Sequence, residues 1–483
     1  MGSGVEVSQR VVVVGGGIGG LTAALALGRA GYPVLVLESD PLPDLADAEA
    51  AFAADRHGAP QVHQTHGFLA RIVVELRERF PDVLDALLAA GCTTMPAVAD
   101  FGDVEPGDAD LSVLIVRRTT FEWVLRQAVV AEPLVEVRAD VRVTGVTGAA
   151  QPWSDGLFVV DGVDLDDGTH EPAGVVVAST GRRGPIPEWL GARGVDVPET
   201  IVESGLMYLS RWYHLPEGSF SVLDPKLMGD LGFVKYIAVP GDGDTLSVTL
   251  AIRADDRELR VALLDPDRFE RACRALPGPD QFFATGSLEP RGPVRPMGGL
   301  LNRIRRFADE DGRPTVLGFH AIGDAHTCTN PLYGRGCSLA VVQALLVTDA
   351  LVDRPDDPSE RARMYERGSR HEVEPWFDVS VQMDRMGADP AGLAGVGPNG
   401  ASRGEEGGRA VAALFVAAAT DPVIGRGLAR FWNLLATPRD LMRDGELLTR
   451  MAAVMADPDA YPVPPRNGPS RTELLDALAA PAD

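Results

Sequence analysis

Two short runs of apolar residues, separated by a glycine-rich stretch and a helix-like segment, open the chain. Val11–Val14 is an uninterrupted apolar run, which is typical of a strand buried on both faces of a parallel sheet. Val34–Leu37 is a second run of the same kind, and Leu21–Ala30 between them has the composition of a helix. The pattern predicts a strand–helix–strand unit that opens an α/β domain.

The turn that leads into this helix has the spacing G-x-G-x-x-G. It contains Gly15, Gly17, Ile18, Gly19 and Gly20. The first glycine of such a turn permits a tight bend, the second lets backbone approach a pyrophosphate, and the third allows close helix–strand packing. The helix N-terminus offers free N–H groups to phosphates, and Glu38, after the second strand, can accept hydrogen bonds from a ribose. The unit predicts a dinucleotide site and leaves FAD and NAD open.

Alternating apolar and polar residues predict a second, antiparallel sheet further along the chain. The segments Gly205–Leu215, Phe233–Val239 and Thr245–Ile252 alternate, and a Gly-Asp-Gly-Asp turn joins the last two. We expect a separate sheet domain here, with aromatic side chains that line an apolar substrate pocket. The candidates for substrate contact are Tyr208, Tyr213, Phe233 and Tyr236.

A second glycine-containing loop lies between a buried strand predicted at Pro314–Phe319 and a long apolar helix predicted over Ser338–Leu351. Its candidate residues are Gly323, Asp324, Pro331, Gly334 and Gly336. The N-terminus of a helix favours a negatively charged ligand, and an acid just before it can hold a ribityl or ribose hydroxyl. An ordinary strand–loop–helix crossover without a ligand explains the same pattern.

Helical periodicity recurs in several other places. Thr65 is expected to cap a helix that runs up to Pro81, and a second helix is predicted over Thr119–Val130. Helical patterning returns from Pro358 into the 370s, and a glycine-rich linker is predicted at 387–408. The remainder is expected to form short helices broken by proline.

Composition and charge narrow the classes of partner. Of the 483 residues, 45% are hydrophobic and 24% are charged, as in a soluble globular protein. The formal charge of −24 argues against nucleic acid or an anionic membrane surface as the main partner. Neither a signal peptide nor an apolar run long enough for a membrane span is recognisable, so we expect a cytoplasmic protein.

The positions of cysteine and histidine predict no metal site. The cysteines show no metal-type spacing and are expected to be free thiols in a reducing compartment; they are Cys92, Cys273, Cys328 and Cys337. His63 and His66 lack a third ligand nearby in the sequence and are expected to belong to a cofactor-proximal loop.

Taken together, the motifs resemble the flavoprotein monooxygenases with one Rossmann domain, the aromatic hydroxylase and squalene epoxidase superfamily. The resemblance implies that the first glycine motif and Glu38 hold the ADP half of FAD, and that Gly323 and Asp324 hold the ribityl chain. It also implies that the loop with Pro331, Gly334 and Gly336 lies against the flavin ring. These assignments cover most of residues 10–350.

Two arginines extend the resemblance. Arg118, at the start of a predicted helix, looks like the family's arginine near the ribityl–phosphate region of FAD. Arg56 opens Arg56–Gln61, which resembles the R-x-G-x-P-Q-x-x-H-x-H loop of bacterial polyene epoxidases that act before polyether ring closure; the histidines here are spaced differently. The resemblance is therefore closest to bacterial polyketide epoxidases.

The resemblance implies a fold and a domain division. We expect an α/β protein with a Rossmann-like FAD-binding domain of the glutathione-reductase type, an inserted antiparallel-sheet substrate domain and a helical C-terminal region. The FAD-binding domain would comprise residues 1–202 and 292–372. The substrate domain would comprise residues 203–291, and the helical region residues 373–483.

The resemblance also implies a reaction. One oxygen atom would pass from a flavin C4a-hydroperoxide to an apolar natural-product substrate, by epoxidation or hydroxylation, with no dedicated catalytic acid or base in the protein. Electrons would come from NADPH or NADH, directly or through a separate flavin reductase. Ser179–Pro185 departs from the family's middle motif, and no second G-x-G-x-x-G follows a strand, so a stable second dinucleotide site is not expected.

Other functions remain open on the same fold. A flavin-dependent reductase of the geranylgeranyl reductase type would share these motifs. A non-catalytic binding protein would not need the set of Glu38, Arg118 and Asp324. Flavin-dependent halogenation is disfavoured because that family relies on an N-terminal lysine, and the first lysine here is Lys226.

Overall fold

The structure, a computed structural model, describes residues 10–216, 227–284, 288–388, 404–463 and 467–479. Its central layer is a parallel sheet with the strand order β18-β9-β1-β2-β5. These strands are β1 (Val11–Val14), β2 (Val34–Leu37), β5 (Val135–Arg138), β9 (Val175–Ala178) and β18 (Phe319–Ala321). The predicted opening unit and α/β class are confirmed.

The two faces of the parallel sheet are covered differently. Val11 and Val13 pack against helices, which are α1 (Ile18–Arg29), α3 (Ala70–Arg79), α4 (Pro81–Ala89), α5 (Arg118–Val130) and α10 (Gly336–Asp353). Val12 and Val14 pack against a smaller sheet of β6 (Val143–Ala150), β7 (Phe158–Leu165), β8 (His170–Pro172) and β17 (Val316–Leu317), together with α6 (Ile186–Gly191). The result is a helix–sheet–sheet sandwich, so β1 is buried on both faces, as its unbroken valine run predicts.

A separate antiparallel sheet lies where the sequence predicts one, and it is called the substrate sheet below after that prediction. Its strand order is β12-β13-β14-β11-β15, with β11 (Leu206–His214), β12 (Met228–Asp230), β13 (Val234–Gly241), β14 (Thr245–Arg253) and β15 (Glu289–Met297). The outer face is covered by α7 (Arg257–Leu263), α8 (Pro266–Ala275) and α9 (Pro279–Ala284). The other face turns toward the parallel-sheet domain, since side chains of β11 bond to residues of that domain.

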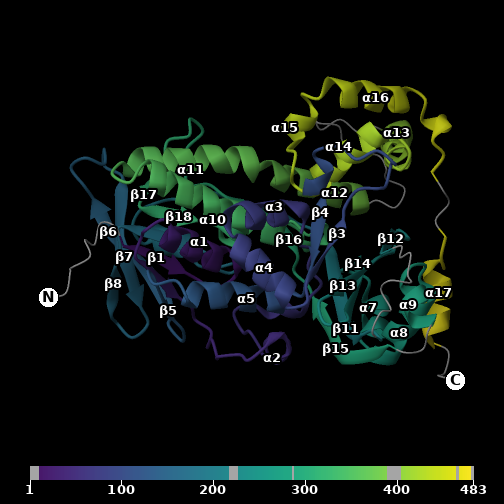
Figure 1. Ribbon diagram of the computed structural model, residues 1–483, viewed down its shortest axis with the longest axis horizontal. Helices are drawn as coiled ribbons and strands as arrows, with labels where there is room; N and C mark the ends of the chain where they lie inside the picture. Colours follow the sequence, from purple (N-terminus) through teal and green to yellow (C-terminus); the bar gives the residue numbers. More distant parts are fainter. Residues whose placement is uncertain (1–9, 217–226, 285–287, 389–403, 464–466, 480–483) are drawn as a thin grey trace.

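The C-terminal region is helical, as the sequence predicts. It is preceded by α11 (Pro358–Glu372) and contains α12 (Pro375–Ala388), α13 (Gly404–Ala417), α14 (Pro422–Trp432), α15 (Pro438–Leu441), α16 (Gly445–Ala456) and α17 (Arg471–Ala479). Figure 1 shows α13 to α16 as a cluster at the upper right, whereas α17 lies beside α8 and α9 at the substrate domain. Leu474 and Leu478 of α17 enter the apolar core of that domain. Most of the predicted glycine-rich linker lies outside the described residues.

The remaining elements are short. They are α2 (Ala48–Ala53), β3 (Thr93–Pro96), β4 (Ser112–Ile115), β10 (Glu199–Glu203), β16 (Leu301–Arg305), β19 (Thr327–Cys328) and the 3-10 turns Pro60–His63, Asp108–Asp110, Gly323–Ala325, Pro331–Tyr333 and Pro458–Ala460. Strands β10, β16 and β19 form one small sheet, and β3 and β4 form another.

Two local predictions are wrong in detail. Thr65 does not cap α3, which begins at Ala70; the Ala70 N–H donates to Asn433 Oδ1 at 3.1 Å instead. A residue from the distant C-terminal region therefore supplies the cap, which local sequence cannot reveal. The strand predicted at Pro314–Phe319 is split into β17 and β18 by Gly318, whose φ of 74° belongs to the left-handed region.

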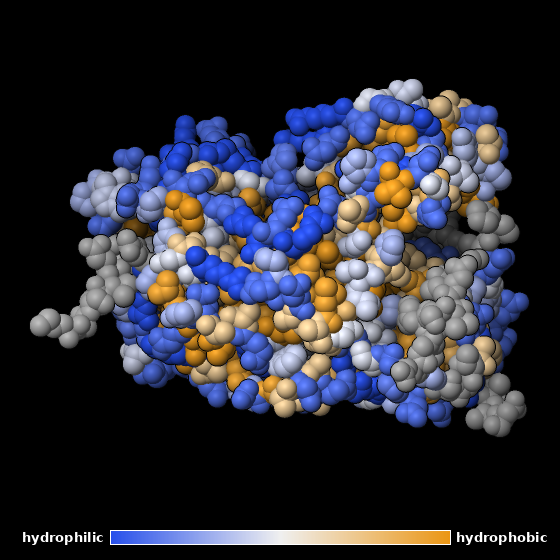
Figure 2. All heavy atoms as spheres, in the orientation of Figure 1, coloured by the Kyte–Doolittle hydropathy of each residue, from blue (hydrophilic) through white to orange (hydrophobic). Residues whose placement is uncertain are grey.

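Among the described residues one helix, α10, is long and apolar enough to cross a membrane by length and composition, although the sequence alone suggested no such span. Since 72% of its apolar window is buried inside the protein, it has the character of a core helix. Helices α13 and α14 together are also long and apolar enough to cross a membrane, although the chain bends by 105° between them. The face shown in Figure 2 mixes hydrophilic and hydrophobic side chains.

Candidate cofactor site

The glycine turn after β1 combines two tight contacts with one open position. A Cβ on Gly15, whose φ is 108°, would lie 2.4 Å from the Ser179 carbonyl oxygen, and a Cβ on Gly20 would lie 1.9 Å from the Gly15 carbonyl oxygen. Gly17 has no neighbouring atom within 4 Å of such a Cβ. Gly15 thus lets the turn pass close to the backbone after β9, Gly20 lets α1 pack closely on the turn, and Gly17 leaves an open stretch of backbone.

The helices that follow the two glycine motifs, α1 and α10, lack a side-chain cap at their N-termini, as do α4, α5 and α6. Gly17 caps α1 without a side-chain hydrogen bond, and Arg335 occupies the same position on α10. Neither helix has an acidic residue in its first turn. Free N–H groups and the helix dipole make both ends favourable for a negatively charged ligand.

The two glycine motifs, some three hundred residues apart, converge on one side chain. A Cβ added to Gly19 would lie 3.3 Å from Ala340 Cβ, and a Cβ added to Gly323 would lie at the same distance from it. Ala340 belongs to the first turns of α10, which packs on α1. The structure therefore brings both motifs to one place, as a single extended cofactor requires.

Glu38 directly follows β2 beside this turn and is buried in a network of donors. Its Oε2 accepts from the Gly16 N–H at 2.7 Å, and its Oε1 accepts from the Asp40 N–H at 2.9 Å. Arg56 lies 3.3 Å from Glu38 and also pairs with Asp40 at 3.1 Å and Glu122 at 3.2 Å. Arg56 thus joins the loop after β2 to α5 and orients Glu38.

Arg118 begins α5 and bonds to Glu122 and His66. Its Nε donates to Glu122 Oε1 at 2.8 Å, and its Nη1 lies 3.0 Å from His66 Nε2. Burial, with the Arg118 charge beside it, lowers the pKa of His66 to about 3, so this imidazole is neutral at physiological pH. His66 therefore accepts a hydrogen bond from Arg118, a role that its spacing from His63 did not indicate.

Asp324 lies at the N-terminus of α10, within reach of the charge of Arg118. A Cβ added to Gly336 would lie 3.9 Å from Asp324 Oδ1. Burial raises the pKa of the Asp324 carboxyl, and the charges of Arg118, Arg182 and Arg303 oppose that shift. The arrangement places an acceptor-rich carboxyl beside an uncapped helix end, where polyol hydroxyls and anionic groups can both be bound.

Arg117, next to Arg118, is a structural residue that the sequence reasoning missed. It is buried, and its Nη2 lies 2.7 Å from Asp242 Oδ2 and 2.7 Å from Glu49. Asp242 also accepts from the Arg117 N–H at 2.6 Å and from Thr120 Oγ1 at 2.7 Å. Because Asp242 lies in the turn between β13 and β14, this pair ties α5 to the substrate sheet.

The four aromatic candidates for substrate contact lie on different faces of the substrate sheet. Tyr208 faces the parallel-sheet domain and donates to Asn330 Oδ1. Tyr213, with no exposed surface, stacks edge-on against Phe283 of α9, on the helix-covered face. Phe233 and Tyr236 belong to the same helix-covered core. Alternation along the strands thus separates Tyr208 from the other three, which pack in the domain core.

Small hydroxyl side chains occupy the middle of the face toward the parallel-sheet domain. Ser210 Oγ donates to Gln64 Oε1 at 2.6 Å and lies 2.6 Å from Thr249 Oγ1. Thr65 lies 2.6 Å from Thr249 Oγ1 and also contacts Ser247. These hydrogen bonds fix the loop that carries His66 against the substrate sheet. Because the Thr65 hydroxyl is used there, Thr65 is not a helix cap.

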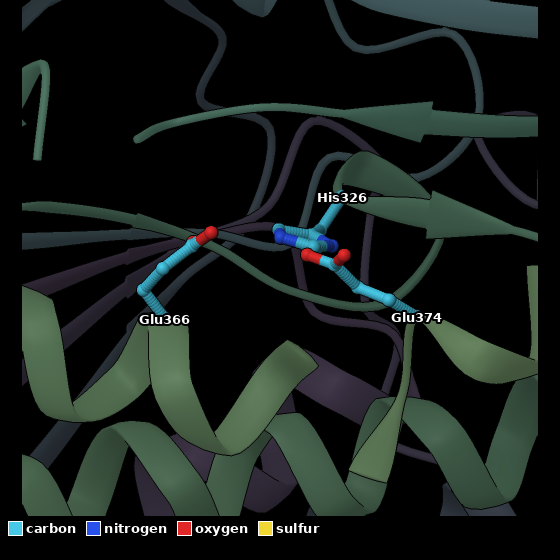
Figure 3. Close-up of side chains that lie close together, drawn as sticks. All are labelled: His326, Glu366 and Glu374. Atoms are coloured by element: carbon cyan, nitrogen blue, oxygen red, sulfur yellow. The ribbon is translucent and has the colours of Figure 1, made fainter. Parts of the chain in front are cut away.

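One group of side chains outside this region has ligands for a metal ion. His326, Glu366 and Glu374 have ligand atoms that all lie within 4.8 Å of one another, and Figure 3 shows both carboxyl groups pointing toward the imidazole. Each carboxylate is already paired with an arginine: Glu366 with Arg370 at 2.7 Å, and Glu374 with Arg306. We interpret the group as a part-buried set of ion pairs at the place where α11 and the residue segment after it meet the β18–β19 connection.

Comparison with known proteins supports the same cofactor. The family model of FAD-dependent oxidoreductases matches residues 10–100. The chain is 27% identical over 361 residues to para-nitrophenol 4-monooxygenase of Pseudomonas sp. strain WBC-3, covering 72% of this chain and 78% of that protein.

Solved structures share the fold. The p-nitrophenol 4-monooxygenase PnpA of Pseudomonas putida DLL-E4 has a TM-score of 0.61 at 19% identity, over 89% of this chain and 98% of that chain. The flavin-dependent brominase Bmp2 has a TM-score of 0.61 at 16% identity, over 93% of this chain and 98% of that chain. At these identities the likenesses show the fold and do not separate monooxygenation from halogenation.

The residues fit FAD. The open backbone at Gly17, the uncapped end of α1 and the buried Glu38 form a cradle for an adenosine diphosphate moiety. Asp324 and the uncapped end of α10 continue it toward the substrate sheet. The sequence indicated each of these groups. The hydrogen bonds and ion pairs that hold the surrounding loops in place join residues that are distant in sequence.

Proposed function

We propose that this chain, an FAD-dependent monooxygenase of the aromatic hydroxylase type, transfers one oxygen atom from molecular oxygen to an apolar small molecule by hydroxylation or epoxidation. The observation that carries the proposal is the convergence of Gly19 and Gly323 on Ala340, since it brings to one place the two motifs to which we assign the two halves of FAD. FAD, when bound, supplies the chemistry: in reduced form it activates oxygen and delivers one atom to the substrate.

The protein's own residues bind and orient. We assign the pyrophosphate to the backbone of Gly15–Gly20, the adenosine ribose to Glu38, and the ribityl chain to Asp324 with Arg118 beside it. Arg56 holds Glu38 in place. The N-terminus of α10, at Gly336, favours negative charge on the ring of the reduced cofactor.

The substrate is proposed to lie between the Pro331–Gly336 loop and the facing side of the substrate sheet. Leu332 of this loop packs in an apolar cluster with Tyr208, Ala251 and Leu300. Of the aromatic candidates we retain Tyr208 as a contact on this face. A phenol or a polyene satisfies the apolar requirement, and the likeness to p-nitrophenol monooxygenases makes nitrophenols the first probes.

Electrons are proposed to come from NADPH or NADH, either directly and transiently or through a separate flavin reductase. We also propose a reducing, cytoplasmic location, because the four cysteines, all within the described residues, are buried free thiols.

Isotope transfer tests the proposal. The purified protein is reconstituted with FAD, reduced anaerobically and mixed with ¹⁸O₂ and a panel of phenols and polyenes. We expect at least one product with a single ¹⁸O atom and a matching fall in hydrogen peroxide. A saturated product formed without oxygen would establish the alternative, a reductase of the geranylgeranyl reductase type. Failure to bind FAD would favour a binding protein on this fold, and recovery of all oxygen as peroxide across the panel would contradict monooxygenation.

A further inference from the structure

Helix α12 contacts the Asn330–Gly336 loop at both of its ends. Asp384, on α12 and only 7% exposed, lies beneath the start of the loop. Ser380, one helical turn earlier, accepts from Arg335 Nη1 at 2.8 Å at the end of the loop. The Arg335 guanidinium also stacks on Trp376 of α12, 5.0 Å from the ring centroid. A helix of the C-terminal region thus forms the floor under the loop.

Asp384 is the acceptor for three donors. Its Oδ1 accepts from Asn330 Nδ2 and from the Tyr333 hydroxyl, each at 2.7 Å, and its Oδ2 accepts from Asn302 Nδ2 at 2.7 Å. An ionised carboxylate can only accept, so both asparagine amides must turn their NH₂ groups toward it. Their carbonyl oxygens are thereby turned away from Asp384 and toward the loop.

Those two amide oxygens hold the loop backbone. Asn302 Oδ1 accepts from the Asn330 N–H at 2.8 Å, and Asn330 Oδ1 accepts from the Leu332 N–H at 3.1 Å. Asn330 Oδ1 also accepts from the Tyr208 hydroxyl of the substrate sheet. The orientation of both amides, and with it the conformation of the loop, is consequently set by a carboxylate more than fifty residues later in the chain.

We propose that Asp384 is a positioning residue that fixes the Asn330–Gly336 loop against the flavin ring and the substrate. It acts through Asn302, Asn330 and Tyr333 and touches no reacting atom. The assignment rests on the proposed function for the role of the loop, whereas the hydrogen-bond network itself exists without cofactor. It gives the C-terminal helical region a part in the reaction.

The variant Asp384→Asn tests this role with little change of shape. An asparagine can accept at one oxygen only, so one of the three donors must face another NH₂ group. We expect amide exchange at Asn330 and Leu332 in the cofactor-free protein to become at least tenfold faster. In the reconstituted protein, a larger share of reducing equivalents should end as hydrogen peroxide, with kcat for product falling more than KM rises. Asp378→Asn, at an exposed position on the same helix, is the matched control and should change neither quantity.

The outcomes separate the two proposals. If exchange at Asn330 and Leu332 in Asp384→Asn equals that of the wild type, the positioning role is overturned, whatever the reaction. If exchange rises but no substrate receives oxygen even in the wild type, the network stands and the proposed reaction fails. Should Asp384→Asn not fold, Tyr333→Phe removes a single donor and should give a smaller increase in peroxide yield; an unchanged yield would contradict the proposal.

Discussion

The two ends of the proposed FAD site are built by different means. At the pyrophosphate end, the Gly15–Gly20 turn depends on backbone and on side chains that are missing: a Cβ at Gly20 would lie 1.9 Å from a carbonyl oxygen. At the ring end, the Asn330–Gly336 loop depends on side chains that are present, from β16, from the substrate sheet and from α12. The first end is local in sequence and tolerates no added atom at Gly15 or Gly20. The second end is assembled over long range and tolerates no lost acceptor.

This difference predicts how each end responds to change. Substitutions at the pyrophosphate end should affect folding or FAD affinity. Substitutions at the ring end should leave FAD bound and change the ratio of oxygenated product to hydrogen peroxide. The pyrophosphate end would therefore determine whether FAD is bound. The ring end would determine whether oxygen is transferred to the substrate or released as hydrogen peroxide.

The largest effects are expected in a glycine pair. Gly20→Ala forces a Cβ into the Gly15 carbonyl and should cost at least about 3 kcal/mol of folding free energy. Gly17→Ala places its Cβ in open space and should cost less than about 1 kcal/mol. If the pyrophosphate lies over Gly17, however, this second variant should weaken FAD binding by roughly a hundredfold. Chemical denaturation measures the folding free energies, and FAD titration measures the affinities. Equal FAD affinity of Gly17→Ala and wild type would contradict the placement of the pyrophosphate over Gly17.

A neighbouring arginine pair should separate domain docking from cofactor binding. Arg117→Met leaves Asp242 buried without its cation and should reduce the free energy of unfolding by about 3 kcal/mol. Arg118→Met should instead weaken FAD binding by about 2 kcal/mol, or roughly thirtyfold, because the charge beside Asp324 is removed. The same two measurements apply. A lowered free energy of unfolding with unchanged FAD affinity in Arg118→Met would reverse the assignment.

Acid should weaken the strand that leads to the ring end. Burial, reinforced by the charge of Arg361, lowers the pKa of His320 on β18 to about 3. The unfolded chain takes up a proton at this residue below about pH 6.5 and the folded chain does not, so its stabilising contribution is complete above pH 6.5 and declines as the pH falls toward 3.

Between pH 6.5 and pH 5 this histidine should account for a loss of about 1–2 kcal/mol that His320→Leu does not show. Denaturation curves at the two pH values give the difference directly. His57→Leu, at an exposed position, is the control and should retain the wild-type loss. An identical loss in wild type and His320→Leu would show that His320 does not remain neutral in the folded protein.

The smallest effect concerns two buried thiols, Cys92 and Cys337, whose charged neighbours include Arg117 and Arg118 at the N-terminus of α5. Burial raises the pKa of Cys337 to about 11 and that of Cys92 to about 12. At pH 8 only about one Cys337 side chain in a thousand is ionised, so iodoacetamide should modify neither thiol in the native protein within hours. Mass spectrometry of native and urea-unfolded samples checks this. Rapid modification of Cys337 alone would show that the ring end opens more readily than the contacts of α12 suggest.

Sequence was sufficient where the structure is local. The valine runs, the glycine spacing and the start of α5 at Arg118 follow from neighbouring residues, and the structure has each of them. The antiparallel sheet was also predictable, because alternation and the turn before Thr245 lie within one short stretch.

Sequence was insufficient where a side chain's partner is distant. Asn433 caps α3, Asp242 pairs with Arg117, and Asp384 orients Asn330; none of these pairs has a local signal. Sequence also did not show which face of the substrate sheet turns toward the proposed cofactor site. Alternation shows that Tyr208 and Tyr213 point in opposite directions, and only the packing of α8 and α9 shows which direction leads away from the cofactor site.

A crystal structure of the protein grown with FAD would test the central claim most directly. The account predicts one FAD per chain, with its pyrophosphate over Gly17, its ribityl chain at Asp324 and its ring against the Pro331–Gly336 loop. FAD bound elsewhere, or a ring that does not reach the loop anchored on α12, would contradict it.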